Sequence, residues 1–575
     1  MRLYALLARE GLRCALSLAR ALVLRLFPAP VRAPEQLLVA PQDLRTADPT
    51  LAADYYAGFF AFAGRVVETR GESPFAVTPP SQAWDEELCG FSWLRHLRAA
   101  NTDIARAHAR SLVEDFLEHD GDRRGAGAAP RVAARRLISF LSQTPLLLEG
   151  ADQNFYSRFM RTIGRSVAQL RAAAGPDVTA DDRLLIAIAQ CFAGLCLGAP
   201  PRAQARSDAA LSALLNRHVL QDGGHVSRNP RRLIELLADL LPLRQTYTAR
   251  GLEPPMALIT AIDRMMPMLR LFRHDDGSIA LFNGMGASEP DLLATILAYD
   301  DTHARPMTHA PWSGYERVAA GRALLIADVG APPPRPFSAE AHAGCLSFEF
   351  SCAGSALVVN CGASPVDAPA ARLAARSTAA HSTVTVADSS SCRFAGAPQG
   401  DWLAAAIERL VGPLVLCGPT QVRAERSGDA AGFRLAASHD GYLSRYGVIH
   451  ERRFWLPAAG DGLHGVDRLE RSGGGEVSAV IRFHLHPSVQ ATPDPDGQAV
   501  SLVTPDGQHW RFEAPGHVTH IDESVWFAAP GGPRPSRQLV IDMLVPENVA
   551  FTEISWRFTR VAWERPDVME DLPAE

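Results

Sequence analysis

The spacing of apolar residues changes part-way along this 575-residue chain, and that change limits the fold more than any other feature. Between about residues 51 and 298 the spacing is helical, as in the set Leu258, Ile262, Met265, Leu269 and Phe272. These positions advance by four, three, four and three, so they share one helix face. After Pro311 the spacing becomes two, which is typical of strands. The sequence therefore predicts an all-α domain followed by an all-β domain.

The helical part divides into several runs. They are predicted near 54–68, 101–119, 131–148, 154–174, 182–197 and 207–220. A later run contains Leu233, Leu237 and Leu240, and we expect Pro242 to bend or end that helix. Many helices at fairly regular intervals predict helical hairpins arranged as a bundle, a solenoid or a toroid.

Short strand-like runs fill the second part. They are Cys345–Phe350, Ala356–Val359, Thr383–Val386, Val477–His486, Ala499–Val503 and Gln538–Val545. Because no helical runs lie between them, we expect antiparallel sheets in a sandwich or stacked arrangement. We assign residues 1–45 to an N-terminal amphipathic extension, 46–310 to the helical domain and 311–575 to the β-domain.

Composition removes several classes of function. All 57 basic residues are arginine, which excludes a Schiff-base lysine, a pyridoxal phosphate anchor and the lysine of a nucleotide-binding P-loop. The net charge of −6 argues against a nucleic-acid binder. An odd count of nine cysteines in so long a chain does not indicate a disulfide framework. Any anion that the protein binds must therefore be met by guanidinium, imidazole or backbone donors.

The first 30 residues are apolar but interrupted by charge. The interruptions are Arg9, Glu10, Arg13, Arg20 and Arg25. No uncharged stretch reaches the length of a secretory signal core, and none reaches the roughly 20 apolar residues of a transmembrane helix. An amphipathic helix that docks on the protein or on a membrane surface fits better. The sequence by itself leaves the localisation open.

The densest polar cluster is the segment Asp222–Pro230, with the sequence DGGHVSRNP. It places His225, Arg228 and Asn229 in one loop before a helix that we expect to begin near Arg231. Loops at one end of a helical domain are good places for a binding or catalytic site. A capped, well hydrogen-bonded turn explains the same residues equally well.

Other polar clusters match no single catalytic template. His381 precedes a strand, where a lone histidine is more often structural than catalytic. His484 and His486 share one strand face, and without a third ligand a structural interpretation is preferred to a metal pair. The G-x-S-x-G, H-E-x-x-H, C-x-x-C and post-strand G-x-G-x-x-G motifs are all absent.

Several segments together resemble the heparinase II/III-like proteins of bacteria. They are Asp222–Pro230, Asp275–Gly284, Ala341–Phe350, Val359–Gly362, Ala379–Thr383, His439–Tyr442 and His450–Arg452. The resemblance covers roughly residues 50 to 560. It implies an incomplete (α/α) toroid joined to stacked antiparallel sheets, and it implies a polysaccharide lyase that cleaves uronic-acid-containing glycans. It also points to the periplasm or cell envelope, although the lack of a recognisable signal peptide keeps the cytoplasm open.

The resemblance assigns roles in β-elimination to particular residues. His381 matches the family's catalytic histidine, while His225, Arg228 and Asn229 would neutralise the uronate carboxylate from the toroid side. A tyrosine would donate or accept the second proton. Tyr247, Tyr299 and, in the β-domain, Tyr442 are the candidates.

No cofactor is required for this chemistry, but the resemblance implies a possible structural zinc site. His439, His450 and Asp401 are its candidate ligands, and Thr383 stands where a further histidine would be expected. The expected partner is an acidic polysaccharide and not a nucleic acid, while the sequence gives no oligomeric state. Two alternatives to a lyase remain: a non-catalytic carbohydrate-binding or envelope-glycan protein, and a glycoside hydrolase that uses paired carboxylates.

Overall fold

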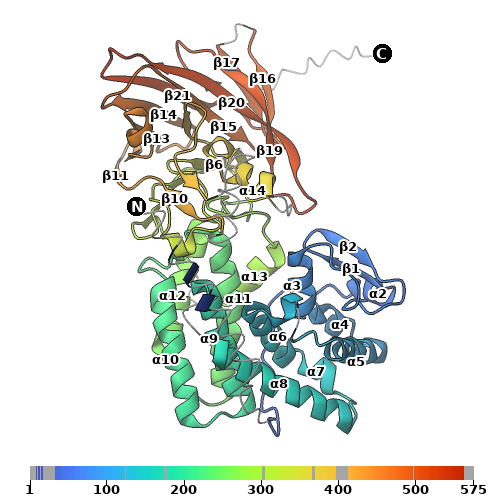
Figure 1. The fold of residues 1–575 in the computed structure, drawn as a ribbon. Helices are drawn as coiled ribbons and strands as arrows, with labels where there is room; N and C mark the ends of the chain where they lie inside the picture. Colours follow the sequence, from blue (N-terminus) through green and yellow to red (C-terminus); the bar gives the residue numbers. More distant parts are fainter. Residues whose placement is uncertain are drawn as a thin grey trace, which may run out of the picture.

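The computed structural model has the predicted two parts, a helical domain and a pair of stacked β-sheets (Figure 1). The structure describes residues 33–123, 125–173, 178–300, 305–364, 369–395, 412–495 and 498–561, together with residues 8, 11, 12, 15 and 16. The fold class predicted from the sequence, an (α/α) toroid followed by antiparallel sheets, is confirmed. Within the described residues, no helix is long and apolar enough to cross a membrane.

In the helical domain, α6 packs against α9 and α11 packs against α12. Its helices are α2 (Leu51–Tyr56), α3 (Gln82–Gly90), α4 (Leu94–Ala100), α5 (Asp103–Glu118), α6 (Pro130–Ser142), α7 (Thr144–Leu148), α8 (Gln153–Ala173), α9 (Ala180–Leu197), α10 (Pro201–His218), α11 (Pro230–Ala249), α12 (Met256–Leu271) and α13 (Pro290–Ala298).

One run of the helical prediction is wrong, and one of the two alternatives for Pro242 is excluded. The run 54–68 is not one helix, because α2 ends at Tyr56 and a hairpin follows, formed by β1 (Phe59–Phe62) and β2 (Arg65–Glu68). Gly58 and Gly64 have positive φ, which permits the turns on either side of β1. Pro242 does not end its helix either, since α11 continues to Ala249.

The β-domain contains two large antiparallel sheets. The nine-stranded sheet has the order β19 (His520–Trp526), β20 (Arg534–Val545), β15 (Val477–Leu485), β7 (Ser355–Val359), β6 (Phe348–Cys352), β5 (Ala323–Asp328), β4 (Tyr315–Ala320) and β3 (His309–Ala310), with β8 (Val384–Val386) paired to β15. The eight-stranded sheet has the order β11 (Val422–Asp429), β12 (Gly432–His439), β13 (Val448–Pro457), β14 (Gly462–Arg471), β21 (Phe551–Val561), β18 (His509–Glu513), β17 (Ala499–Val503) and β16 (Gln490–Pro493).

Smaller elements complete this domain. They are the short paired strands β9 (Arg393–Phe394) and β10 (Val415–Cys417) and the helices α14 (Pro369–Arg376) and α16 (Leu443–Tyr446).

Strand β5 explains why the two domains form one body. All six of its residues are buried. Since neighbouring side chains along a strand face opposite sides of the sheet, both faces of the sheet are covered at β5. Leu324 and Ile326 belong to the core of the helical domain, whereas Leu325 belongs to the core between the two sheets. At β5, the nine-stranded sheet is therefore covered on one face by the helical domain and on the other by the second sheet.

Candidate functional site

The loop Asp222–Pro230 lies at the seam between the two domains. It connects α10 to α11, and the carboxylate of Asp222 accepts hydrogen bonds from the backbone nitrogens of Trp312 (2.9 Å) and Ser313 (2.7 Å). Gly223, with φ of +84°, lies so close to the Arg264 carbonyl that a β-carbon would clash with it. The loop is thus held against the first residues of the β-domain.

Arg228 is buried in this seam and hydrogen bonds only to the protein. Its guanidinium donates to the carbonyl oxygens of Ser313 (2.6 Å), Gly314 (3.0 Å), Gly330 (3.1 Å) and Ala331 (3.0 Å) and pairs with the carboxylate of Asp328. These contacts use Nε and both terminal nitrogens, which together carry all five N–H donors of an arginine. No donor remains for a substrate carboxylate, so the predicted neutralising role of Arg228 does not fit this geometry.

Asn229 has two structural tasks. Its Oδ1 accepts a hydrogen bond from the backbone nitrogen of Arg231 (2.9 Å) and so caps α11, while its Nδ2 donates to Glu340 (2.9 Å). Glu340 also pairs with Arg232 at 2.9 Å and keeps 45% of its side chain exposed. The seam is therefore open to solvent beside Glu340.

His225 lies next to a second histidine and an aspartate. Its Nε2 is 4.0 Å from Oδ1 of Asp181, and Nε2 of His218 is 3.6 Å from the same oxygen. Nδ1 of His225 lies 2.7 Å from the hydroxyl of Ser227. Phe337, which follows β5 in the chain, packs edge-on against both imidazole rings. His225 is thus brought to the seam as predicted from the loop, but among residues that the sequence did not indicate.

His381 forms a pair with His342. The Nδ1–H of His381 donates to the Ser377 carbonyl (2.7 Å), so its Nε2 is an acceptor, 3.0 Å from Nδ1 of His342. Burial lowers the pKa of His381 to about 4, which keeps it neutral at pH 7. Nδ1–H of His342 therefore donates to His381, and Nε2 of His342 is left with a lone pair. His342 lies in the segment Ala341–Phe350, which contributes to the family resemblance, but no role was predicted for it.

The tyrosines predicted as proton donors lie elsewhere. The hydroxyl of Tyr247 is buried among helices, bonded to Asp208 and Gln204, and Tyr442 donates to the Val384 carbonyl at 2.8 Å. Tyr299 donates to Gln42 at 3.0 Å. None of these three hydroxyls contacts His225 or His381.

The tyrosine that does reach the seam is Tyr315 on β4. Its hydroxyl donates to the Arg228 carbonyl (2.6 Å) and accepts from Asn283 (2.8 Å). Tyr315 is fully buried, and burial raises its pKa above the ordinary value. The hydroxyl of Tyr315 therefore both donates and accepts a hydrogen bond within the protein.

The described residues predicted as zinc ligands, His439 and His450, hydrogen bond to each other. His439 and His450 are partners across β12 and β13, with 3.4 Å between their nearest ring nitrogens. The other nitrogen of His450 is 2.8 Å from Asp467, a carboxylate that also binds Arg452 and Trp556. Asp401 lies outside the described residues. Nδ1 of His439 accepts a hydrogen bond from the backbone nitrogen of Gly441 (3.0 Å), so its Nε2 carries a proton and donates to Nδ1 of His450. A hydrogen bond therefore joins the two nitrogens that a zinc ion would need.

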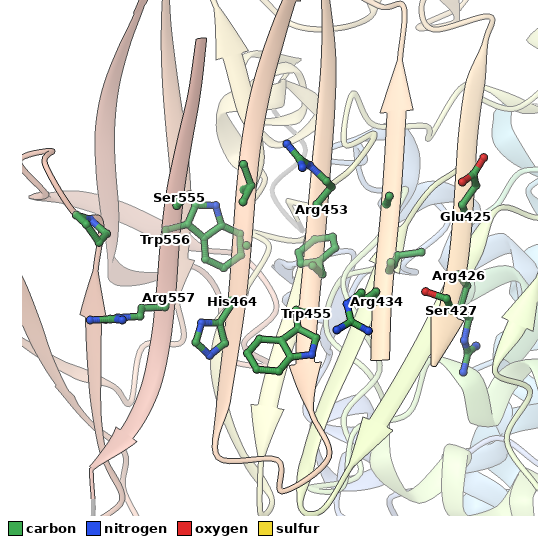
Figure 2. Close-up of a pocket in the computed structure, with 16 residues that line it drawn as sticks. Glu425, Arg426, Ser427, Arg434, Arg453, Trp455, His464, Ser555, Trp556 and Arg557 are labelled. Atoms are coloured by element: carbon green, nitrogen blue, oxygen red, sulfur yellow. The ribbon is translucent and has the colours of Figure 1, made fainter. Parts of the chain in front are cut away.

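A separate groove of about 620 Å³ lies on the eight-stranded sheet, across β11, β12, β13, β14 and β21 (Figure 2). Trp455 and His464 lie side by side in it, with ring centroids 4.8 Å apart. Its arginines are paired with acidic side chains, as in Arg434 with Asp429 (2.8 Å). The groove offers an aromatic surface bordered by ion pairs, at a distance from the seam.

Comparison with known proteins gives one sequence family and one group of folds. The sequence model described as "Heparinase II/III-like, C-terminal" matches residues 302–557. The FtsZ-localized protein C of Caulobacter vibrioides is 33% identical over 542 residues, which is 92% of this chain and 91% of that protein.

The similar solved structures share the fold at low identity. A crystal structure of heparinase III has a TM-score of 0.68 at 14% identity and covers 94% of this chain and 88% of its own. The heparan sulfate lyase HepC of Pedobacter heparinus has a TM-score of 0.60 at 13% identity, covering 95% of this chain and 88% of its own. The chondroitin AC lyase of Streptomyces coelicolor, with 0.54 and 11%, covers 90% and 79%.

Proposed function

The chain belongs to the heparinase II/III-like family, and we propose that it is a protein localised by FtsZ that has a polysaccharide lyase fold without a complete lyase site. The observation that carries this proposal is the 33% identity to an FtsZ-localized protein, which extends over 92% of the chain. The similarity to the lyase structures, at 11–14% identity, concerns the fold.

The chemistry of the seam supports the proposal that the lyase site is incomplete. β-Elimination needs a group that neutralises the uronate carboxylate, a base for the C5 proton and an acid for the leaving oxygen. Arg228 and Asn229 are committed to protein acceptors, and the hydroxyl of Tyr315 is bonded on both sides. The predicted neutralising donors, Arg228 and Asn229, and the hydroxyl of Tyr315 are therefore not free for this reaction.

The first test is binding to FtsZ. Purified full-length protein should bind purified FtsZ of the same organism in a saturable manner, measured by biolayer interferometry. Heparinase III is a suitable control because it shares the fold, and we expect no binding from it. A signal that does not saturate, or one that heparinase III reproduces, would contradict recognition of FtsZ by this chain.

A second candidate function, elimination on an acidic glycan, is favoured by the pair His342 and His381. The carbonyl of Ser377 orients His381, and His381 orients His342, so that Nε2 of His342 is presented as a base. A general base must have an unprotonated atom, and these two hydrogen bonds leave Nε2 of His342 unprotonated.

Glycan cleavage is tested by the ultraviolet absorbance of the unsaturated uronate product. We expect wild-type protein to produce none from a panel of uronate glycans. If product does form, His342→Gln should reduce its rate by about 10²–10⁴-fold, the usual contribution of a general base, while Trp455→Ala in the groove should not. New reducing ends without this absorbance would indicate hydrolysis instead.

The same two variants separate cleavage from binding alone. A glycan that binds without being cut would favour the carbohydrate-binding alternative. Loss of that binding in Trp455→Ala would place it in the groove, and loss in His342→Gln would place it at the seam.

A further inference from the structure

Three potential metal ligands lie close together at the seam, and the proposed function gives this group no role. They are Asp181 in the first turn of α9, His218 at the end of α10 and His225 in the loop that follows. One ligand atom from each lies within 4.8 Å of the other two. His218 is fully buried, His225 is 3% exposed, and 33% of the Asp181 side chain reaches solvent.

The local backbone fixes the two imidazoles relative to each other. The backbone nitrogen of Val226 donates to the His218 carbonyl at 2.8 Å, and Val219 forms a β-bridge with His225. Phe337 covers both rings, with centroid distances of 5.1 Å to His218 and 6.3 Å to His225. The arrangement is therefore preformed and needs no movement of the loop.

The atoms that face one another are all acceptors or can become so. Nδ1–H of His218 donates to the Leu214 carbonyl (2.8 Å), so its Nε2 carries a lone pair, which points at Asp181. Within the described part of the chain, Nε2 of His218 and Oδ1 of Asp181 are buried without a hydrogen-bond partner. Two facing acceptors repel each other unless a proton or a cation lies between them.

The surroundings restrict what can fill this position. Burial lowers the pKa of both His218 and His225, which disfavours a proton on either ring. Burial raises the pKa of Asp181, but a proton on that carboxyl would satisfy only one of the two imidazoles. Three other charges act on Asp181. Arg232 and Glu340 are paired with each other at 2.9 Å, and Asp182 adds a second negative charge. A cation that binds nitrogen and oxygen ligands is therefore the occupant that satisfies all three side chains.

The separations match a transition metal with small adjustments. Zinc bonds of about 2.0–2.1 Å place neighbouring ligand atoms of a tetrahedral site roughly 3.3–3.4 Å apart. The separations from Oδ1 of Asp181 are 3.6 Å and 4.0 Å, and the two imidazole nitrogens lie within 4.8 Å of each other, so the side chains would turn inward to bind the metal. The backbone nitrogen of Ser227 donates to Nδ1 of His225 (3.2 Å), so Nε2 of the neutral ring carries the proton. Metal binding through Nε2 would shift that proton to Nδ1, where the Ser227 hydroxyl at 2.7 Å would accept it in place of the backbone contact.

We infer that Asp181, His218 and His225 form a binding site for one divalent transition-metal ion of the zinc and iron(II) class. Two histidines and one carboxylate are a ligand set that such metals use when part of the coordination sphere stays open. The site goes beyond the proposed function, because recruitment by FtsZ does not require a metal.

The test uses cobalt(II) and zinc(II) with the purified full-length protein after chelator treatment. Wild type should bind one equivalent of cobalt, giving visible ligand-field bands without the charge-transfer bands of a thiolate ligand. Asp181→Asn and His218→Gln should each weaken zinc binding by at least about 100-fold, since the loss of a direct ligand should exceed the loss of a supporting contact. The exposed histidine variant His520→Gln should bind like wild type.

Several outcomes would overturn the inference. They are the absence of stoichiometric binding to wild type, wild-type affinity in Asp181→Asn, and cobalt bands that show sulfur ligation. Asp181→Asn preserves side-chain volume at a half-buried position, so it tests the site even if His218→Gln fails to fold. In addition, zinc should raise the melting temperature of wild type and of His520→Gln, but not that of Asp181→Asn.

Discussion

Replacing Arg228 by alanine is expected to lower the free energy of unfolding by about 3–5 kcal/mol, as breaking a buried ion pair does. The substitution leaves the buried carboxylate of Asp328 without its cation, and it removes the hydrogen bonds to the carbonyls of Ser313, Gly314, Gly330 and Ala331. These acceptors belong to the β-domain side of the seam. Urea denaturation followed by circular dichroism measures the effect.

The controls for this experiment are two other arginine variants. Arg228→Lys keeps the charge but not the planar fork, so its loss of stability should be intermediate. Arg434→Ala removes an exposed arginine from its pair with Asp429 and should change stability little. If Arg228→Ala were as stable as Arg434→Ala, the guanidinium would not be the structural clamp described above, and a catalytic role would need to be considered again.

Acidification from pH 6.5 to pH 4 is expected to destabilise the protein strongly. Burial lowers the pKa of His381 to about 4 and that of His484 to about 3, against an ordinary value of about 6.5. In this window the unfolded chain binds protons that the folded chain does not, so stability falls as pH falls. Each of these two groups contributes roughly 3–5 kcal/mol over its full shift.

The pH dependence can be measured as melting temperature between pH 7.5 and pH 4. His484 hydrogen bonds to Ser524 and to the Ala379 carbonyl and can be replaced by glutamine. His484→Gln should show a shallower fall with acid than wild type, because one of the protonating groups is gone. A melting temperature that stays constant across this range would mean that these histidines are not held neutral in the folded protein.

The overall architecture was predictable because it depends on the spacing of apolar residues. Strands such as β15 and β17 begin at the predicted residues Val477 and Ala499, since alternation reports burial on one face. The hairpin of β1 and β2 was missed because each strand has only four residues, although the buried Phe60 and Phe62 alternate as in a strand. Strand β5, buried on both faces, does not alternate and gave no comparable signal.

The sequence predicted where the candidate site lies, but not the roles of its residues. The loop with His225 and Arg228 does lie at the seam, but only the three-dimensional structure shows that the donors of Arg228 are all used. His342 lies 39 residues from His381 in sequence, and Asp181 lies 44 residues before His225. Partners so distant in the chain are brought together by packing, which no local motif encodes.

Imaging a fluorescent fusion of the full-length protein in cells that can be depleted of FtsZ tests the proposed function most directly. We predict that the fusion gathers where FtsZ gathers and disperses when FtsZ is removed. A fusion that is stable and full-length, yet is distributed in the same way with and without FtsZ, would contradict the proposal.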